Sequence, residues 1–150
     1  MIAHILDEFP LGLRLAEAAE RAGGGPRCRL VRAASLGPLR RWSEADALLA
    51  ELAGPENDPE LRAQALGLAA DMSFWHQGQD VAVGRRLLRD AVDELPPSAR
   101  SSVLVQEARL AIAGFALDEA LQAAFDAAAV AETLEDRAHA LATASLAATL

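Results

Sequence analysis

Apolar residues recur at three- and four-residue steps along most of this chain, and glycine and proline separate the stretches in which they do so. Between Asp58 and Pro97 two such stretches flank a break at Gly78. Residues at this spacing share one side of a helix, so each stretch predicts an amphipathic helix. Pro59 suits a first turn behind an Asp58 N-cap, and Asp80 suits the N-cap of the second helix. This part of the chain is therefore predicted to form a helical hairpin.

Each helix of this hairpin has a predicted inner side, and the second helix also has a charged side. The expected inner residues of the first helix are Leu61, Ala65, Leu68, Ala69, Met72 and Trp75. Those of the second helix are Val83, Leu87, Leu88, Ala91, Val92 and Leu95. The residues expected to face water are Arg85, Arg86, Arg89, Asp90, Asp93 and Glu94. A single hairpin cannot bury both apolar sides, so it needs further helices packed against it.

The remaining sequence predicts those helices. The pattern indicates a short helix or turn within residues 1–10 and helices over Leu11–Ala22, Arg27–Leu36, Trp42–Ala53, Ser98–Ala113, Leu117–Thr133 and Leu134–Leu150. The inner residues of the first full helix are expected to be Leu11, Leu15, Ala18, Ala19 and Ala22. Ser43 and Ser98 are the expected N-caps of their helices. The chain is therefore predicted to be all-α.

The predicted helices repeat with a nearly constant period. The second helix of each pair begins near Trp42, Asp80 and Leu117, at steps of 38 and 37 residues. A fixed period of this length is typical of stacked helical hairpins. We therefore expect residues 1–150 to form one repeat domain, with hairpins at about 27–54, 58–97 and 98–133 and a half repeat at 134–150.

The last predicted helix, Leu134–Leu150, ends without a capping residue, a glycine or a proline. We therefore expect the chain to be a fragment of a longer protein. Its apolar stripe is expected to lie exposed at the end of the stack, where it would mediate self-association. The residues of this stripe are Leu134, Ala138, Leu141, Ala142 and Leu146.

Composition narrows the possible functions. The chain has 14 arginines and no lysine against 22 acidic residues, for a net charge of −8. Such a charge disfavours direct contact with nucleic acid or with an acidic membrane. A single cysteine, Cys28, excludes an internal disulfide and suits a reducing compartment. With no signal peptide, and with its longest uncharged run too short to span a bilayer, the protein is expected to be cytoplasmic.

No set of residues has the spacing of a catalytic or metal site. His4, His76 and His139 are far apart from one another and from Cys28. Metal ligands usually come with local spacing, so we expect no metal, no cofactor and no enzymatic activity. Acidic pairs such as Asp118–Glu119 open helices, where they favour the positive end of the helix dipole.

Five arginines form a block without acidic residues: Arg27, Arg29, Arg32, Arg40 and Arg41. One interpretation is a docking surface for an acidic partner or for nucleic acid. The other is a solvated face, or pairing with acidic residues elsewhere in the chain. We favour the second interpretation, because five arginines make a modest charged surface.

The segment from Gln77 to Pro97 resembles the second half of a tetratricopeptide (TPR)-like repeat. Gly78 stands at the turn, Ala91 at the small residue where helices cross, and Pro96 at the terminal proline, with paired leucines in between. This resemblance implies a right-handed superhelix of stacked antiparallel helical hairpins, a TPR-like α-solenoid.

A longer stretch starting at Phe74, FWHQGQDVAVGRRLLRDAVDELP, resembles the middle region of large LuxR-type transcriptional regulators, the MalT-like group. Those proteins carry a P-loop ATPase and a helix-turn-helix at their two ends. Without lysine the chain cannot contain GxxxxGK[ST], and it shows no basic recognition helix. The resemblance implies a non-catalytic sensor or oligomerisation segment that binds a small effector or a protein. The alternative is a TPR-like protein interaction scaffold unrelated to transcription.

The resemblance also implies a site. First helices line the concave surface in such arrays, and the position of Gly78 then places Leu68, Met72, Trp75 and His76 on that surface. Large aromatic residues with a polar tip suit the anchoring of a ligand or peptide. The alternative for Trp75 is that it fills the seam between two repeats.

Overall fold

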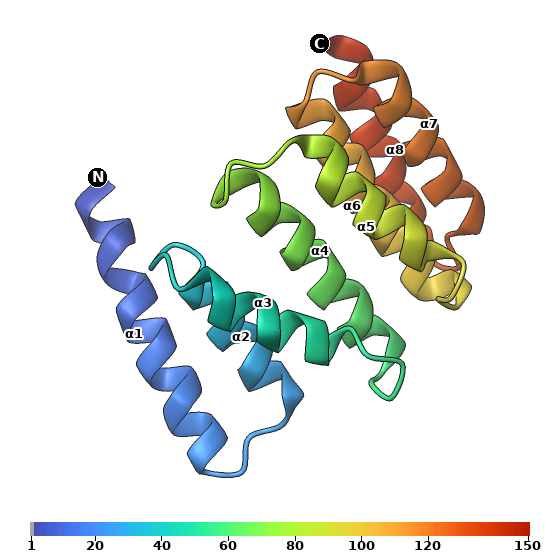
Figure 1. Cartoon of the computed structure of the whole chain (residues 1–150). Helices are drawn as coiled ribbons and strands as arrows, with labels where there is room; N and C mark the ends of the chain where they lie inside the picture. Colours follow the sequence, from blue (N-terminus) through green and yellow to red (C-terminus); the bar gives the residue numbers. More distant parts are fainter. Residues whose placement is uncertain (1) are drawn as a thin grey trace.

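The computed structural model describes the backbone from Ile2 to Leu150 and the side chains from Glu8 onward. Every regular element in residues 2–150 is a helix, which confirms the all-α prediction (Figure 1). The helices are α1 (Ile2–Arg21), α2 (Pro26–Leu36), α3 (Trp42–Leu52), α4 (Pro59–Trp75), α5 (Val81–Val92), α6 (Pro97–Ala113), α7 (Leu117–Val130) and α8 (Leu134–Thr149). Within this part of the chain, none of the helices combines the length and the apolar character needed to cross a membrane.

Local capping chemistry sets the ends of the central hairpin as predicted. The Asp58 carboxylate accepts hydrogen bonds from the backbone N–H groups of Glu60 (3.0 Å) and Leu61 (3.3 Å) at the start of α4. Asp80 accepts one from the N–H of Ala82 (2.8 Å) at the start of α5. Gly78 has a φ of +67°, which glycine adopts without steric cost. These contacts satisfy N–H groups that a helix leaves unpaired at its start.

The N-terminal helix differs from its prediction. α1 is one helix through Pro10, instead of a short element followed by a helix from Leu11. The predicted inner residues Leu11 and Leu15 are exposed, while Leu13 and Ala16 are buried. A Cβ on Gly12 would lie 2.9 Å from the Ser35 Oγ of α2. This close approach turns the Gly12–Leu13–Ala16 side of α1 toward α2, and the other leucines away from it.

Three further details of the predicted helices are wrong. Ser43 and Ser98 do not cap α3 and α6, whose N-caps are Arg41 and Pro96 without a side-chain hydrogen bond. In α5, Val83 and Leu87 are exposed although both were expected inside. α5 also packs against few neighbours on that side, because no two odd-numbered helices pack backbone to backbone in the described structure, although an Arg85–Glu119 ion pair joins α5 to α7.

The helices form two layers. α2, α4, α6 and α8 run in one direction, and α3, α5 and α7 run in the opposite direction (Figure 1). Each helix contacts the next along the chain, and α4 also contacts α2 and α6, while α6 also contacts α8. The even-numbered helices therefore make a continuous layer, and the odd-numbered helices cover its outer side one by one.

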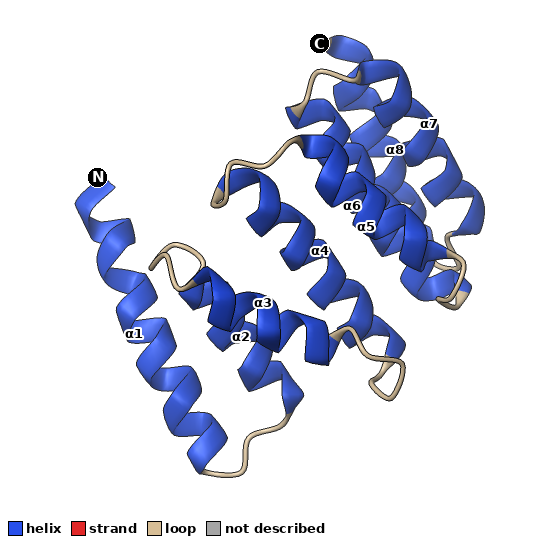
Figure 2. Cartoon of the chain, in the orientation of Figure 1, coloured by secondary structure: helices blue, strands red, loops and turns tan. Residues whose placement is uncertain are grey.

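The turns inside the pairs repeat as well. Arg40, Gly78 and Phe115 have positive φ values of 59°, 67° and 57°, and each lies in the short loop between an even-numbered helix and the next one (Figure 2). They are 38 and 37 residues apart, which agrees with the period of the sequence pattern. A residue with positive φ thus recurs in the loop of three successive pairs, although only one of the three is glycine.

The core changes in character along the stack. Leucine and methionine side chains fill the interfaces among α1 to α5, and Leu36, Leu49, Leu52, Met72 and Leu88 are almost completely buried. Among α6, α7 and α8 the buried clusters consist mainly of alanine. The predicted apolar stripe of α8 lies exposed, with Leu134 at 83% exposure and Leu141 and Leu146 near half.

Candidate binding groove

The structure does not bring the four predicted site residues onto one surface. Met72 is 1% exposed and belongs to the leucine-rich core, where its Sδ and Cε lie next to Gly37. His76 is exposed at the C-terminal end of α4. Trp75 is 64% exposed and packs edge-on against Phe74, with ring centroids 4.6 Å apart. Leu68 is half-buried and lines a hollow between α4 and α6.

Met72 therefore offers almost no surface to a ligand in this conformation, because it belongs to the buried core. Trp75 does not fill a seam, because most of its surface is in solvent. A binding role for Trp75 and His76 remains a prediction. Leu68 is the one predicted residue that lies in the groove described next.

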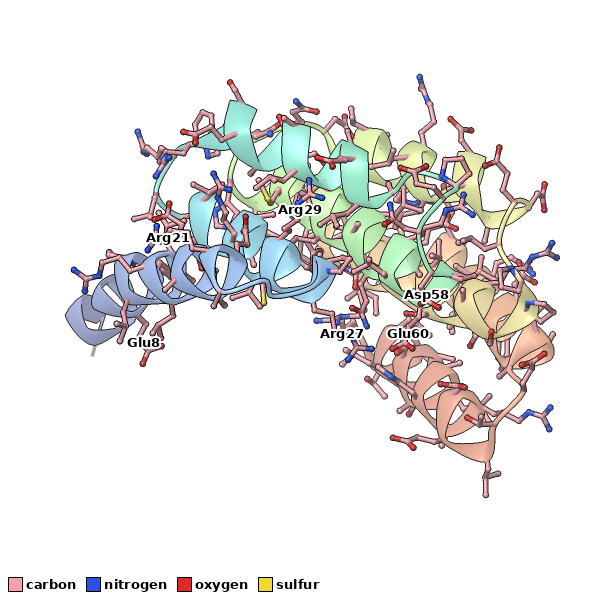
Figure 3. The ribbon with its side chains drawn as sticks, turned by 90° about the horizontal axis from the view of Figure 1, so that it is seen from below. Glu8, Arg21, Arg27, Arg29, Asp58 and Glu60 are labelled. Carbon is pink, nitrogen blue, oxygen red and sulfur yellow. The ribbon has the colours of Figure 1, made fainter. Side chains whose placement is uncertain are left out.

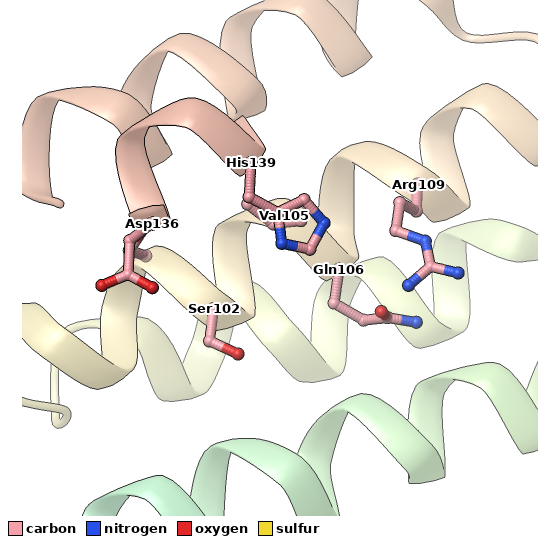
Figure 4. Close-up of a pocket in the computed structure, with 7 residues that line it drawn as sticks. Ser102, Val105, Gln106, Arg109, Asp136 and His139 are labelled. Atoms are coloured by element: carbon pink, nitrogen blue, oxygen red, sulfur yellow. The ribbon is translucent and has the colours of Figure 1, made fainter. Parts of the chain in front are cut away.

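Three adjoining hollows follow the exposed face of α4, α6 and α8. Their volumes are about 150, 320 and 260 Å³. Ser102 of α6 lines all three, and Asp136 of α8 lines two of them. Figure 4 shows the hollow between α6 and α8, with Ser102, Gln106 and Arg109 on one side and Asp136 and His139 on the other. The hollows share lining residues and adjoin one another along α4, α6 and α8, and together they are called the groove.

The groove has small side chains along its base and polar side chains that can form hydrogen bonds. Ala63, Gly67 and Ala99 line it from α4 and α6. A Cβ on Gly67 would lie 3.4 Å from Gln106, so the two helices are close at this point. The amides and hydroxyls along the groove belong to Gln64, Ser98, Ser101, Ser102 and Gln106. Such a surface allows a ligand backbone to approach and to be hydrogen-bonded.

Acidic residues stand at both ends of the groove. Glu60 and Asp136 share the hollow at the start of α4 and α8, where no basic residue is among the lining side chains. Figure 3 shows Asp58 and Glu60 at the start of α4. Gln64 donates a hydrogen bond of 3.1 Å to Glu60, and the Thr133 hydroxyl donates one of 2.6 Å to Asp136. Both carboxylates thus accept a hydrogen bond from a neutral side chain, and neither forms an ion pair in the described structure.

At the other end, Asp71 is a half-buried carboxylate. Burial raises the pKa of Asp71, and the positive charge of Arg109, the neighbouring Gln106 amide and His76 oppose this shift. The Gln106 amide is close, but its buried Nε2 makes no hydrogen bond of good geometry in the described structure. Asp71 forms no ion pair there either, so its charge is only partly compensated.

Six arginines outside the groove form ion pairs with acidic residues in the described structure: Arg29, Arg32, Arg41, Arg62, Arg85 and Arg89. Arg85, expected in water, is buried and pairs with Glu107 (3.5 Å) and with Glu119, while Arg89 pairs with the same Glu107 (2.5 Å). These pairs join α5, α6 and α7. The prediction failed because the face of α5 that carries Arg85 lies against α6, where the buried carboxylate of Glu107 receives it.

The basic block of residues 27–41 is paired in the same way. Arg29 pairs with Glu51, and Arg32 pairs with Glu20 at 3.3 Å (Arg27 and Arg29 are labelled in Figure 3). Arg41 donates two hydrogen bonds, of 2.7 and 2.6 Å, to the Glu44 carboxylate, and these lower the pKa of Glu44. Three of the five arginines therefore take part in intramolecular pairs, as the favoured interpretation expected.

The groove could have been recognised in the sequence from polar residues at helical spacing. Ser98, Ser102, Gln106 and Arg109 follow one side of α6, a helix that is otherwise buried. Glu60, Gln64 and Asp71 follow the matching side of α4. In the part of the chain with described side chains, no group of three His, Cys, Asp or Glu residues could hold a metal ion.

Comparisons with family models, with curated proteins and with solved structures found no match to this chain.

Proposed function

We propose that this chain is a non-catalytic binding module that holds an extended segment of a partner protein in the groove across α4, α6 and α8. The observation that carries the proposal is the length of the groove. Asp71 follows Glu60 by eleven positions along α4, a rise of about 16 Å, since a helix rises 1.5 Å per residue. An extended chain rises about 3.3 Å per residue, so roughly five residues fit this length. A small effector would fill only one of the three hollows.

The proposed architecture is a right-handed TPR-like solenoid. Two observations support it: the continuous layer of even-numbered helices and the positive φ that recurs at Arg40, Gly78 and Phe115, 38 and 37 residues apart. Repeat proteins of stacked hairpins commonly bind along an extended surface that several repeats build together. The groove has this character, because three even-numbered helices contribute to it.

We also propose that the module is the sensor segment of a LuxR-type transcriptional regulator. The support for this is the resemblance of the stretch that starts at Phe74. The reading frame around this sequence tests it. A P-loop upstream and a helix-turn-helix downstream are the expected result. A frame with neither would contradict the assignment to a regulator and favour a general interaction scaffold.

Selection from a displayed library of random linear peptides tests the binding function. The wild-type chain is expected to enrich a family of related peptides. Ser102→Trp should abolish their binding, because Ser102 lies at the junction of all three hollows and is exposed, so a large ring there fills the groove without disturbing the core. Gln122→Trp, which places the same ring on an exposed position of α7, is the matched control and should bind like wild type.

Two results would contradict the binding function. One is the absence of any enriched peptide family on a folded wild-type chain. The other is enrichment that Ser102→Trp leaves unchanged, since the peptides would then bind elsewhere. Circular dichroism of both tryptophan variants should show the helical content of the wild type.

A further inference from the structure

We infer that the segment held in the groove is basic, with one cationic side chain beside Asp71 and a second between Glu60 and Asp136. This inference rests on the proposed binding function and adds the chemistry of the ligand. It follows from the charges along the groove, from the incomplete pairing of Asp71 and from the distance between the two acidic ends.

The charge of the groove is negative. Glu60, Asp71 and Asp136 line it, and Arg109 is the single arginine among the lining side chains. The groove thus carries two more negative than positive charges with His139 neutral, in a chain with a net charge of −8. Such a field attracts a basic segment and repels an acidic one.

Asp71 offers a defined position for a cation. Its carboxylate is half-buried, and within the described structure it has no ion-pair partner. A partly desolvated charge is costly unless it is paired. Arg109 and the Gln106 amide act on the Asp71 carboxylate, but no arginine closes an ion pair with it in the described structure. A guanidinium or ammonium group of the ligand would complete the pairing of Asp71.

The opposite end offers a second position. Glu60 from α4 and Asp136 from α8 line one hollow of about 320 Å³ together with the Ser98 hydroxyl, and no basic residue lines it. Two carboxylates on separate helices can hold the planar donors of an arginine side chain from both sides. This hollow therefore carries more negative charge than the position beside Asp71, whereas the Asp71 position is the more buried of the two.

The two positions fix the spacing of the cations. They lie about 16 Å apart along α4, which corresponds to about five residues of an extended chain. Long flexible arginine and lysine side chains reduce the required separation, so cations three to five residues apart are expected.

The opposite arrangement would be an acidic segment bound to Arg109 and His139. The charges that line the groove disfavour this arrangement. Arg109 already acts on Asp71, so an incoming carboxylate would compete with Asp71 for one guanidinium. It would also lie close to Asp136, which lines the same hollow as Arg109 and His139.

The composition of the selected peptides is the first test. Enriched peptides are expected to carry two arginines or lysines three to five residues apart. Enrichment that depends on Ser102 but shows no preference for cations would overturn this inference and leave the binding function standing. Failure to enrich any peptide would overturn both.

Affinity measurements on the strongest peptide are the second test. Asp71→Asn and Glu60→Gln are expected to weaken binding at least tenfold each, because each removes a charge-assisted contact. A peptide with citrulline in place of arginine, which keeps the shape and removes the charge, should lose as much affinity. Glu132→Gln is the control, since it removes one exposed negative charge outside the groove. Equal affinity of the Asp71 variant, the Glu60 variant and the control would contradict the inference.

Discussion

Two regions of this molecule are packed by different means. In the leucine-packed region, α1 to α5, large side chains from facing helices fill the space between them, and Leu36, Leu49 and Leu52 are almost fully buried. In the alanine-packed region, α6 to α8, the buried residues at the interfaces are mostly Ala108, Ala111, Ala120, Ala123, Ala124, Ala127, Ala140, Ala144 and Ala147. The same two-layer arrangement is thus built from long side chains at one end and from close backbone approach at the other.

The difference explains where the large residues of the last helices lie. In α8 the inward positions are Ala140, Ala144 and Ala147, and the leucines point outward. An alanine interface buries less apolar area for each residue, but it lets helices pack closely enough for backbone atoms to take part in the contact. In this region the largest residues are therefore poor indicators of the core.

The largest expected effect comes from the leucine-packed region. Leu49→Ala should lower the free energy of unfolding by about 2–5 kcal/mol, because the fully buried side chain leaves a cavity that its neighbours cannot fill. Leu141→Ala in α8, which removes the same atoms from a side chain 46% exposed, should cost well under half as much. Urea denaturation of both variants measures the difference. Similar losses would show that α8 relies on its leucines as well.

The reverse substitution tests the alanine-packed region. Ala124→Leu should destabilise the protein by about 1–3 kcal/mol, because its Cβ lies in a fully buried interface without room for three more carbon atoms. Ala142→Leu, on the exposed side of α8, should have almost no effect. Thermal unfolding followed by circular dichroism compares them. A tolerated leucine at position 124 would mean that this region is loosely packed.

Trp75→Ala gives a smaller effect and separates the two roles considered for this residue. We expect a loss of about 1 kcal/mol, mostly from the edge-on contact with Phe74, because 64% of the Trp75 surface is exposed. A tryptophan that filled a seam would cost about 3–5 kcal/mol. Thermal unfolding supplies the measurement, and wild-type tryptophan emission should show a solvent-exposed component.

Asp71→Asn should have the smallest effect on stability, and its pH dependence is distinctive. Burial raises the folded-state pKa of Asp71 above its unfolded value, so the folded state binds the proton more readily. The contribution of the Asp71 carboxyl to the free energy of unfolding is therefore largest below its pKa in the unfolded state. It falls as the pH rises through its higher pKa in the folded state. Asp71→Asn should gain up to about 0.5 kcal/mol at neutral pH, the range of mild substitutions, and lose this advantage toward pH 3. Urea midpoints at several pH values measure it, and an advantage that grows toward acid would contradict the expected sign.

The features predicted correctly depend on neighbouring residues in the chain, although the local caps expected at Ser43 and Ser98 are absent. The caps at Asp58 and Asp80 and the turn at Gly78 each use local hydrogen bonds or local backbone preference, and the structure has all three. The rotation of a helix against its neighbours was harder to predict. Leu11 and Leu15 were placed inside because they are large, whereas the contact of Gly12 with Ser35 decides which side of α1 is buried.

The prediction missed the groove for a similar reason, although polar residues at helical spacing along α6 were a partial signal of it. The predicted site followed from the resemblance and from the position of Gly78. Met72 is core, whereas Trp75 is mostly exposed and its binding role remains a prediction. The groove is made of ordinary residues such as Ser102, Gln106 and Gln64, which become a site only because α4, α6 and α8 lie side by side. Whether such residues form a site depends on how the helices pack together, and the sequence pattern of one helix does not specify that packing.

The most direct test of the proposed groove is a map of backbone amide chemical shifts for the isotope-labelled chain as the strongest selected peptide is added. Shifts are expected to concentrate at Gly67, Ser102, Gln106 and Asp136, from three different helices along one groove, and to vanish in Ser102→Trp. Shifts confined to the exposed apolar side of α8, or to the end of α4 around Trp75, would contradict the groove as the binding site.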